Sequence, residues 1–453
     1  MVLADVHNGN TNNFILIVLD TLRKDYFQKY IEDSISRFDG IGQPSISYNN
    51  AISASNWTIP SHVSMFTGRS PDIHGVHETK NMKSPELFEK ISTEGVPNKE
   101  NLIARIAQRE GYNTVSFASN AYFSPGSGLN YGFNLSTYYP DISYELKNQE
   151  LLGMGKVGDT PEGKGLLKQI YKKEGISGIV KSGFDYMKIK KIRKFNNYPL
   201  IKGADRIIQN LSNSTFEQPF FLFINFMEAH EPYIINEYMK LNQNLHLAGV
   251  SPIKNRILKE IREKYKSEAI LLKTMIFNLM ETLKNMQLLD KTTLIFTSDH
   301  GQALNEQGFY GHGIFHYDSI IKCPLVIKPS KGMNLNRSHD APISTKEIYY
   351  LMKGIVEGDV TVFNNSSDIV FCDSFGVEQS LSMINNLNSA QREDFLKKYD
   401  CRRVSAFDGK YKVTINMDRK QIEEITKEGL IVDQNTKNEN IKKIEEEIYI
   451  YSR

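Results

Sequence analysis

The sequence lacks the features of several familiar classes of protein. Only three cysteines, Cys323, Cys372 and Cys401, occur in 453 residues, and none belongs to a CxxC pair. This spacing argues against a disulfide framework or a zinc ribbon and favours a reducing compartment. No apolar run reaches the length of a membrane span, and the first run, Phe14 to Leu19, is too short for a signal peptide. We therefore expect a cytoplasmic protein without a transmembrane segment.

An excess of charge of either sign is also missing. The chain has 55 Lys and Arg residues against 53 Asp and Glu residues, a formal net charge of +2. We expect no nucleic-acid partner, because this balance gives no global attraction to one. The one local departure is a segment at about 141–200, where Lys164 to Lys194 contain ten basic and two acidic residues. It is either a basic cover over an anionic substrate or lipid surface, or a solvated helical insertion.

What the sequence does contain is a series of continuous apolar runs. Such runs are typical of strands buried on both faces of a parallel sheet, which predicts an α/β fold. The runs are Phe14–Leu19, Thr114–Ala118, Phe220–Phe226 and Thr293–Thr297. After about residue 340 the pattern changes to shorter strands and helices. We therefore expect a catalytic domain at 1–340 and a smaller C-terminal α+β subdomain at 341–453.

Polar residues follow these runs directly. Asp20 comes after the first run, and Asp299 and His300 come after the last. Open α/β sheets bind ligands at the carboxyl ends of their strands. A carboxylate beside an imidazole suits Mn, Zn or a similar divalent ion. Asp20 could equally cap the next helix, and Asn120, which follows the second run, could be a turn residue.

A second pattern places a hydroxyl at the start of a helix. Thr58 precedes Ile59-Pro60, and a residue before proline is pushed away from helical geometry, so we expect Thr58 in a turn. Pro60 suits the first turn of a helix that Gly68 ends. Free N–H groups at a helix N-terminus attract anions, which suits a nucleophile attacking an anionic ester. An ordinary N-cap threonine is the alternative.

Taken together, these segments resemble the sulfatase-like branch of the alkaline phosphatase superfamily. The resemblance rests on four short motifs in a characteristic order, which span most of the chain. They are IVLDTLR at 17–23, WTIPSH at 57–62 with the following Thr67-Gly68, HEPY at 230–233, and TSDHG at 297–301 with the following Gly311-His312-Gly313. The resemblance implies a doubly wound, mainly parallel sheet with helices on both faces and a metal at the strand ends.

The resemblance also implies roles for individual residues. Asp20, Asp299 and His300 correspond to ligands of one divalent ion (Mn, Zn, Ca or Mg), and Thr58 corresponds to the nucleophile that bridges it. His230 and His312 correspond to positions that contact the transferred or leaving group. Asn120 and His62 correspond to positions on the substrate side, and His74 corresponds to a structural histidine. A second ion, recruiting His230, His312 or His316, is the less favoured alternative.

The chain departs from sulfatases proper at two positions. The family's formylglycine precursor is Cys or Ser, but a threonine cannot become that aldehyde, and His62 stands where the family has arginine. Thr21 replaces a second aspartate, so the ligand set resembles that of phosphonate monoester hydrolases and lipoteichoic acid synthases. We therefore expect hydrolysis of a phosphomonoester, phosphodiester or phosphonate, free or linked to a glycan or lipid. Phosphotransfer to an alcohol, true sulfate ester hydrolysis and an inactive binding protein are the alternatives.

Overall fold

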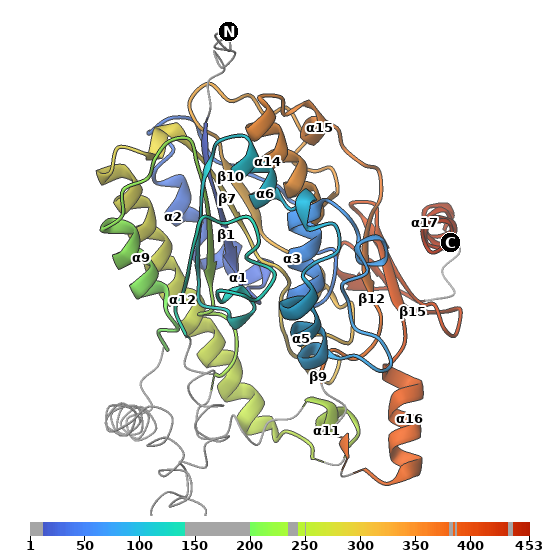
Figure 1. Cartoon of the computed structure of the whole chain (residues 1–453). Coiled ribbons are helices and arrows are strands. Elements are labelled where there is room, and N and C mark those ends of the chain that lie inside the picture. Colours follow the sequence, from blue (N-terminus) through green and yellow to red (C-terminus); the bar gives the residue numbers. More distant parts are fainter. Residues whose placement is uncertain are drawn as a thin grey trace, which may run out of the picture.

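The computed structural model describes residues 12–140, 200–233, 243–249, 251–379, 384–385, 387–433 and 438–453. The basic insertion expected at about 141–200 lies outside these residues, apart from Leu200. The described chain forms a large sheet between two layers of helices, followed by a second, smaller sheet (Figure 1).

The large sheet has seven strands in the order β2-β10-β7-β1-β6-β4-β5. Its central strand β1 (Asn13–Leu19) runs parallel to both β7 (Thr292–Thr297) and β6 (Phe220–Phe226). Next to β6 lie β4 (Asn113–Ala118) and β5 (Leu135–Tyr138), also parallel. Beyond β7, β10 (Leu325–Lys328) runs antiparallel both to β7 and to the edge strand β2 (Ile46–Ser47). The predicted α/β fold with a mainly parallel sheet is confirmed.

Both faces of β1 are fully buried, which explains its unbroken apolar sequence. Ile15, Ile17 and Leu19 pack into one core layer, under helices α12 (Asn255–Asn285), α9 (Ala204–Ser212) and α1 (Lys24–Tyr30). Phe14, Leu16 and Val18 pack into the other layer, under α3 (Thr58–Thr67), α6 (Ile103–Arg109) and α14 (Ile348–Glu357). These two helix layers flank the sheet in Figure 1, as the doubly wound arrangement requires.

Helix α3 differs from the sequence prediction at its first residue. We expected Thr58 in a turn, but the helix begins at Thr58, and the N-cap is Trp57 in an extended conformation. The steric restriction before Pro60 is therefore overridden in the first turn of the buried helix. At the other end Gly68 has φ 70°, as predicted for a glycine that ends a helix. A Cβ on Gly68 would lie 2.5 Å from the ring of Tyr349, so only glycine fits there.

The second sheet confirms the predicted C-terminal α+β subdomain. It is antiparallel, in the order β12-β13-β14-β15-β16. The strands are Val370–Ser374, Arg403–Phe407, Tyr411–Asn416, Gln421–Lys427 and Leu430–Ile431. Helix α17 (Glu439–Tyr451) covers one face through Ile441, Ile444 and Ile448. The division of the chain at residue 340 stays a prediction, and the packing of α14 in the main helix layer favours a later boundary.

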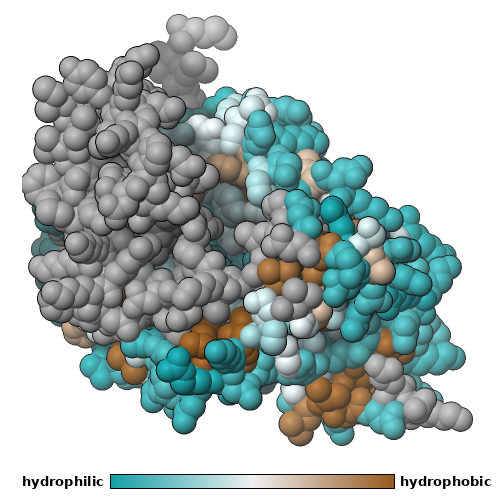
Figure 2. Space-filling model, turned by 90° about the horizontal axis from the view of Figure 1, so that it is seen from below, coloured by the Kyte–Doolittle hydropathy of each residue, from teal (hydrophilic) through white to brown (hydrophobic). Residues whose placement is uncertain are grey.

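Figure 2 shows the molecule from below. The described surface in view is largely hydrophilic, with apolar residues in several groups. Within the residues that the structure describes, no helix has both the length and the apolar character needed to cross a membrane.

Candidate metal centre and active site

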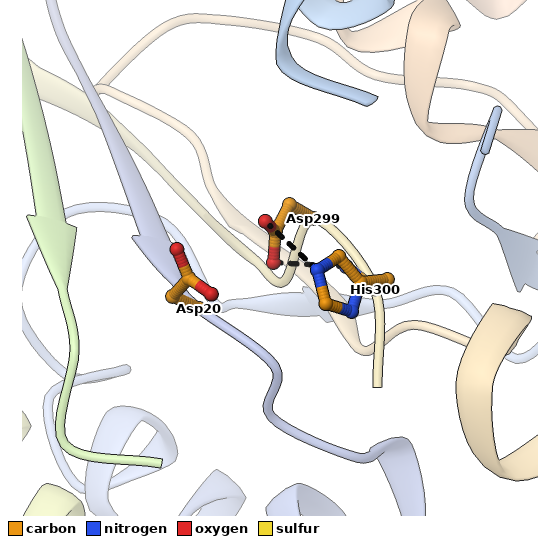
Figure 3. A group of neighbouring side chains, drawn as sticks. All are labelled: Asp20, Asp299 and His300. Carbon is orange, nitrogen blue, oxygen red and sulfur yellow. Dashed lines mark hydrogen bonds and ion pairs between the residues drawn. The ribbon is translucent and has the colours of Figure 1, made fainter. Parts of the chain in front are cut away.

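Three metal-ligand side chains meet at the carboxyl ends of two neighbouring strands. Asp20 follows β1, and Asp299 and His300 lie just beyond β7 (Figure 3). One ligand atom of each residue lies within 4.8 Å of the others, and all three residues are fully buried. They form the sole group of this kind in the described part of the chain.

A strained turn fixes the distance between the two strand ends. Thr21 has φ 58°, a left-handed conformation that is rare for a β-branched residue. Its backbone N–H donates to Oδ1 of Asp299 at 3.1 Å, and its carbonyl accepts from the Tyr265 hydroxyl at 2.8 Å. Strain of this kind persists where surrounding contacts hold it, and it is common at functional sites. Thr21 therefore ties the end of β1 to the carboxylate of Asp299.

Each aspartate uses one carboxylate oxygen for protein hydrogen bonds and keeps the other for a ligand. Asp20 Oδ2 accepts from Nδ2 of Asn120 at 2.8 Å, and Asp299 Oδ1 accepts from the backbone N–H of His300 at 2.9 Å. The other two oxygens, Asp20 Oδ1 and Asp299 Oδ2, are buried without a hydrogen-bond partner. Leaving such atoms unpaired is costly, so a bound cation fits this pair.

His300 presents the third ligand atom. Its Nδ1 lies 2.8 Å from the carbonyl of Gly301, which assigns the proton to Nδ1 and leaves the lone pair of Nε2 available. That Nε2 lies 3.5 Å from Oδ2 of Asp299. Two carboxylate oxygens and one imidazole nitrogen thus converge, a donor set that suits a divalent ion.

The protonation of these groups reflects their burial in the absence of an ion. Desolvation, with the charge of Asp299 second, raises the pKa of Asp20 to about 8. Desolvation raises the pKa of Asp299 to about 7, although backbone N–H donors from Thr21 and His300 oppose it. Burial also lowers the pKa of His300. A divalent cation would reverse the penalty on both carboxylates, since it favours their ionised form.

Thr58 lies at the edge of this centre. Its Oγ1 is 3.3 Å from Nε2 of His300, and the residue is buried. The N-cap of α3 is Trp57, with no side-chain cap hydrogen bond, so the alternative of a capping threonine is wrong. The hydroxyl points to the metal centre from the first turn of a helix.

His62 and Asn120 support the site from behind. Nδ1 of His62 lies 2.9 Å from the carbonyl of Thr58 and 3.6 Å from Oδ2 of Asp299. The ring packs against Phe123, with centroids 4.7 Å apart, and burial lowers its pKa to about 3, so it is neutral. Asn120 donates its amide N–H to Asp20. These contacts hold the first turn of α3 and the carboxylate of Asp20, whereas substrate contact by His62 or Asn120 stays a prediction.

Two further histidines extend from the metal centre in a row. The ring of His312 lies 4.5 Å from that of His300 and 5.6 Å from that of His230, measured between centroids. Nδ1 of His312 is 2.6 Å from Oε1 of Gln302, and Nδ1 of His230 is 2.8 Å from the carbonyl of Glu231. These contacts assign the Nδ1–H tautomer to both rings. Desolvation lowers the pKa of His312 well below its usual value.

His74 and His316 lie away from this row. His74 is buried beside α3, where its Nε2 is 3.1 Å from the Ser64 hydroxyl and its Nδ1 accepts from the N–H of Val76. This is the structural role expected for it. His316 contacts Ser374 and Ser405, each at 2.9 Å, and takes no part in the metal group.

Sequence reasoning missed three residues of the site. Gln302 orients His312, and Lys202 donates to the carbonyls of Glu228 and His230 below the turn that carries His230. Oε2 of Glu378 lies 3.9 Å from Nε2 of His312 and reaches the site from the chain after β12. Of the three, only Gln302 could have been suspected from the sequence, because it lies three residues after Asp299. The other two come from distant segments that the fold brings in.

Comparisons with known proteins agree with this geometry. A sequence model of the sulfatase family matches residues 12–352. The chain is 23% identical over 371 residues to iduronate 2-sulfatase of Mus musculus, an alignment that covers 70% of this chain and 59% of that protein. The chain therefore spans less than two thirds of the length of this curated relative.

Solved structures show the same fold at low sequence identity. The phosphonate monoester hydrolase of Silicibacter pomeroyi has a TM-score of 0.62 and 14% identity, over 97% of this chain and 95% of its own. A 2-O GAG sulfatase has a TM-score of 0.62 and 12% identity, over 97% and 91% of the two chains. Enzymes of both substrate types thus share this architecture.

Proposed function

The chain belongs to the sulfatase family of hydrolases of anionic esters, and from that premise we propose that it cleaves a phosphorus ester with Thr58 as the nucleophile. The substrate would be a phosphomonoester, a phosphodiester or a phosphonate, free or linked to a glycan or lipid. The observation that carries this proposal is the 3.3 Å contact between the Thr58 hydroxyl and Nε2 of His300.

The residues of the centre fit one divalent ion. Asp20, Asp299 and His300 would hold it, because their unpaired oxygens and the free lone pair converge in a buried site. An ion held there supplies positive charge that lowers the pKa of a nearby hydroxyl and shields charge on the substrate. Mn, Zn, Ca and Mg remain the candidates.

The reaction would proceed in two displacements at phosphorus. In the first, Oγ1 of Thr58 forms a bond to phosphorus, and the bond from phosphorus to the leaving oxygen breaks. The Nε2 atoms of His230 and His312 contact the transferred group, and one of these rings takes the proton of the Thr58 hydroxyl and returns it to the leaving oxygen. In the second, the oxygen of water forms a bond to phosphorus and the bond from phosphorus to Oγ1 breaks. A proton of that water restores the Thr58 hydroxyl as the phosphorus product leaves. His62 holds the first turn of α3 throughout.

Phosphorus is favoured over sulfur by the chemistry of residue 58. A threonine side chain cannot be oxidised to an aldehyde hydrate, so an enzyme-bound sulfate would have to be hydrolysed directly. The likeness to iduronate 2-sulfatase supports the second candidate, sulfate ester hydrolysis. An alcohol could also replace water as acceptor, and cytoplasmic location is proposed from the free cysteines alone.

A substrate panel tests the proposal. The protein is stripped of metal, reloaded in turn with each of the four ions, and given aryl phosphate, bis-aryl phosphate, aryl phosphonate and aryl sulfate. We expect turnover of at least one phosphorus ester well above that of the sulfate. Faster turnover of the sulfate would establish the second candidate, and no turnover with any ion would favour an inactive binding protein. If an added alcohol is phosphorylated in place of water, the protein is a transferase.

A further inference from the structure

Tyr122 is connected to the metal centre through its backbone. It lies in the short 3-10 helix η2 (Ala121–Phe123), which follows β4 and begins one residue after Asn120. The backbone N–H of Tyr122 donates to Oδ1 of Asn120 at 2.9 Å, and Nδ2 of the same asparagine donates to Oδ2 of Asp20 at 2.8 Å. On this side, two hydrogen bonds join Tyr122 to a proposed metal ligand.

The side chain of Tyr122 is connected to the row of histidines through helix α5 (Ser84–Glu94). Its hydroxyl lies 2.7 Å from Oγ of Ser84, the first residue of that helix. The backbone N–H of Ser84 donates to the carbonyl of Glu378 at 2.9 Å, and Oε2 of Glu378 lies 3.9 Å from Nε2 of His312. Tyr122 therefore belongs to a line of contacts that runs from the metal centre to His312.

Packing fixes the ring of Tyr122 and leaves part of the residue accessible. The ring lies against that of Phe88 in α5, with centroids 5.1 Å apart, and Tyr122 is half-buried. Burial raises the pKa of Tyr122, and the negative charges of Glu378 and Asp20 raise it further. The hydroxyl thus lies near both carboxylates and keeps its proton at neutral pH.

An anionic ester in this site needs hydrogen-bond donors, and the neutral histidines do not supply them. In the Nδ1–H tautomers assigned to His230, His300 and His312, each Nε2 carries a lone pair and no proton. His62 is fully buried, and its Nδ1 is used on the carbonyl of Thr58. The oxygens of an anionic ester accept hydrogen bonds, and preorganised donors stabilise charge that develops on them. A protonated hydroxyl beside the metal centre meets this need.

From this arrangement we propose that the Tyr122 hydroxyl binds an anionic oxygen of the transferred group, a tetrahedral oxyanion of phosphorus or sulfur. Ser84 supports this contact, because its Oγ donates to the phenol oxygen while the phenol proton turns to the ligand. A hydrogen bond to a charged acceptor is stronger than one between neutral groups. The assignment to the transferred group rests on the proposed function, whereas an inorganic oxyanion should bind Tyr122 whether or not the protein is an enzyme.

A structural role for Tyr122 would act through the metal instead. In that role Tyr122 holds Asn120, and Asn120 in turn holds Asp20. The contact with Asn120 is made by the backbone N–H of Tyr122, which a change to phenylalanine keeps. Removal of the hydroxyl alone should therefore weaken oxyanion binding and leave the affinity for the metal unchanged.

Calorimetric titration of the full chain, loaded with the divalent ion that it binds most tightly, tests the assignment with inorganic phosphate and inorganic sulfate. Tyr122→Phe removes the hydroxyl, and Tyr131→Phe is the matched control, because the Tyr131 hydroxyl binds Glu100 on the surface. We expect Tyr122→Phe to bind phosphate about tenfold more weakly with wild-type metal affinity, and the control to match the wild type in both. Ser84→Ala should weaken phosphate less, and combining it with Tyr122→Phe should cause no further loss.

Wild-type phosphate affinity in Tyr122→Phe would overturn the assignment, and so would a loss of metal affinity as large as the loss of phosphate affinity. A further loss in the double variant would overturn the supporting role of Ser84. Sulfate binding tighter than that of phosphate would assign the oxyanion to a sulfate ester.

Turnover of an aryl ester separates this proposal from the proposed function. If Tyr122→Phe weakens phosphate while the wild type turns over no ester with any ion, the proposed function fails and the oxyanion contact stands. If the wild type turns over esters through Thr58 and Tyr122→Phe keeps both its kcat/KM and its phosphate affinity, the proposed function stands and the oxyanion contact fails.

Discussion

The Thr58 hydroxyl lies 3.3 Å from Nε2 of His300, although 242 positions separate the two residues in the sequence. The contact forms because α3 begins beside the carboxyl end of β7, with Asp20 on the neighbouring strand. The proposed nucleophile and a proposed metal ligand therefore share one buried point.

Changes at Thr58 should separate catalysis from metal binding. Thr58→Ala removes the attacking oxygen and leaves the Asp20, Asp299 and His300 ligands in place, so we expect a loss of about a thousandfold or more in kcat. Thr58→Ser keeps a hydroxyl and should retain measurable activity. Metal content, measured by elemental analysis, should stay near wild type in both variants. Wild-type turnover by Thr58→Ala would leave Thr58 no role as the nucleophile.

Asp299→Asn should remove both the metal and the activity. The change replaces an oxygen ligand with a neutral amide while the volume and the hydrogen bond to Thr21 are largely kept, so the fold should survive. Metal content is measured after dialysis against trace ion, and circular dichroism checks the fold. Asp25→Asn, an exposed change in α1, is the control. Full occupancy in the Asp299→Asn protein would show that this carboxylate is not a ligand.

Stability of the metal-free protein should depend on pH through the same two carboxyls. Their pKa values, about 8 for Asp20 and about 7 for Asp299, exceed the unfolded value of 3.8, so the folded state holds more protons than the unfolded state. The free energy of unfolding therefore falls as pH rises until both groups are ionised. Buried histidines such as His62 act in the opposite direction, but only below their ordinary pKa of 6.5.

Thermal melts of chelated protein between about pH 7.5 and pH 8.5 measure this effect, because an unfolded histidine is almost fully deprotonated at the lower limit. We expect Tm to fall across this window, and to fall less in the double variant Asp20→Asn with Asp299→Asn. Bound metal should also flatten the wild-type profile. Identical slopes for wild type and double variant would contradict the assigned pKa shifts.

Lys202 should position His230. This buried lysine donates through Nζ to the carbonyls of Glu228 and His230, 2.7 Å from the former. Lys202→Met should lower kcat about tenfold by releasing the turn. Because it acts through His230, combining it with His230→Ala should cost less than the product of the two single effects. Lys328→Met is the control, since Lys328 is also buried and also binds two carbonyls. If the loss of kcat in the double variant equals the product of the two single losses, Lys202 does not act through His230 and its role is structural only.

Much of the main sheet and of the metal centre was predictable from local sequence. Runs of mostly apolar residues marked β1, β6 and β7, since both faces of these strands are buried. The carboxyl ends of parallel strands meet at one edge, so the strand pattern alone is enough to bring Asp20 and Asp299 together.

Contacts between distant segments were not predictable in this way. The start of α3 at Thr58 overrides a local steric preference, and nothing near Lys202 or Glu378 marks them as neighbours of His230 and His312. Asn120 was assigned to the substrate side, but its hydrogen bond to Asp20 depends on how β4 and β1 are placed across β6. Contacts of this kind are set by tertiary packing, and a short sequence motif does not predict them.

The most direct test is to look for the phosphoryl group on Thr58. The protein is mixed with an aryl phosphate or a phosphodiester that it turns over, quenched in acid within the first turnovers, digested and analysed by mass spectrometry. We predict a phosphorylated peptide with the modification on Thr58, absent from Thr58→Ala. An unmodified Thr58 peptide throughout active turnover would contradict the role of Thr58 as the nucleophile.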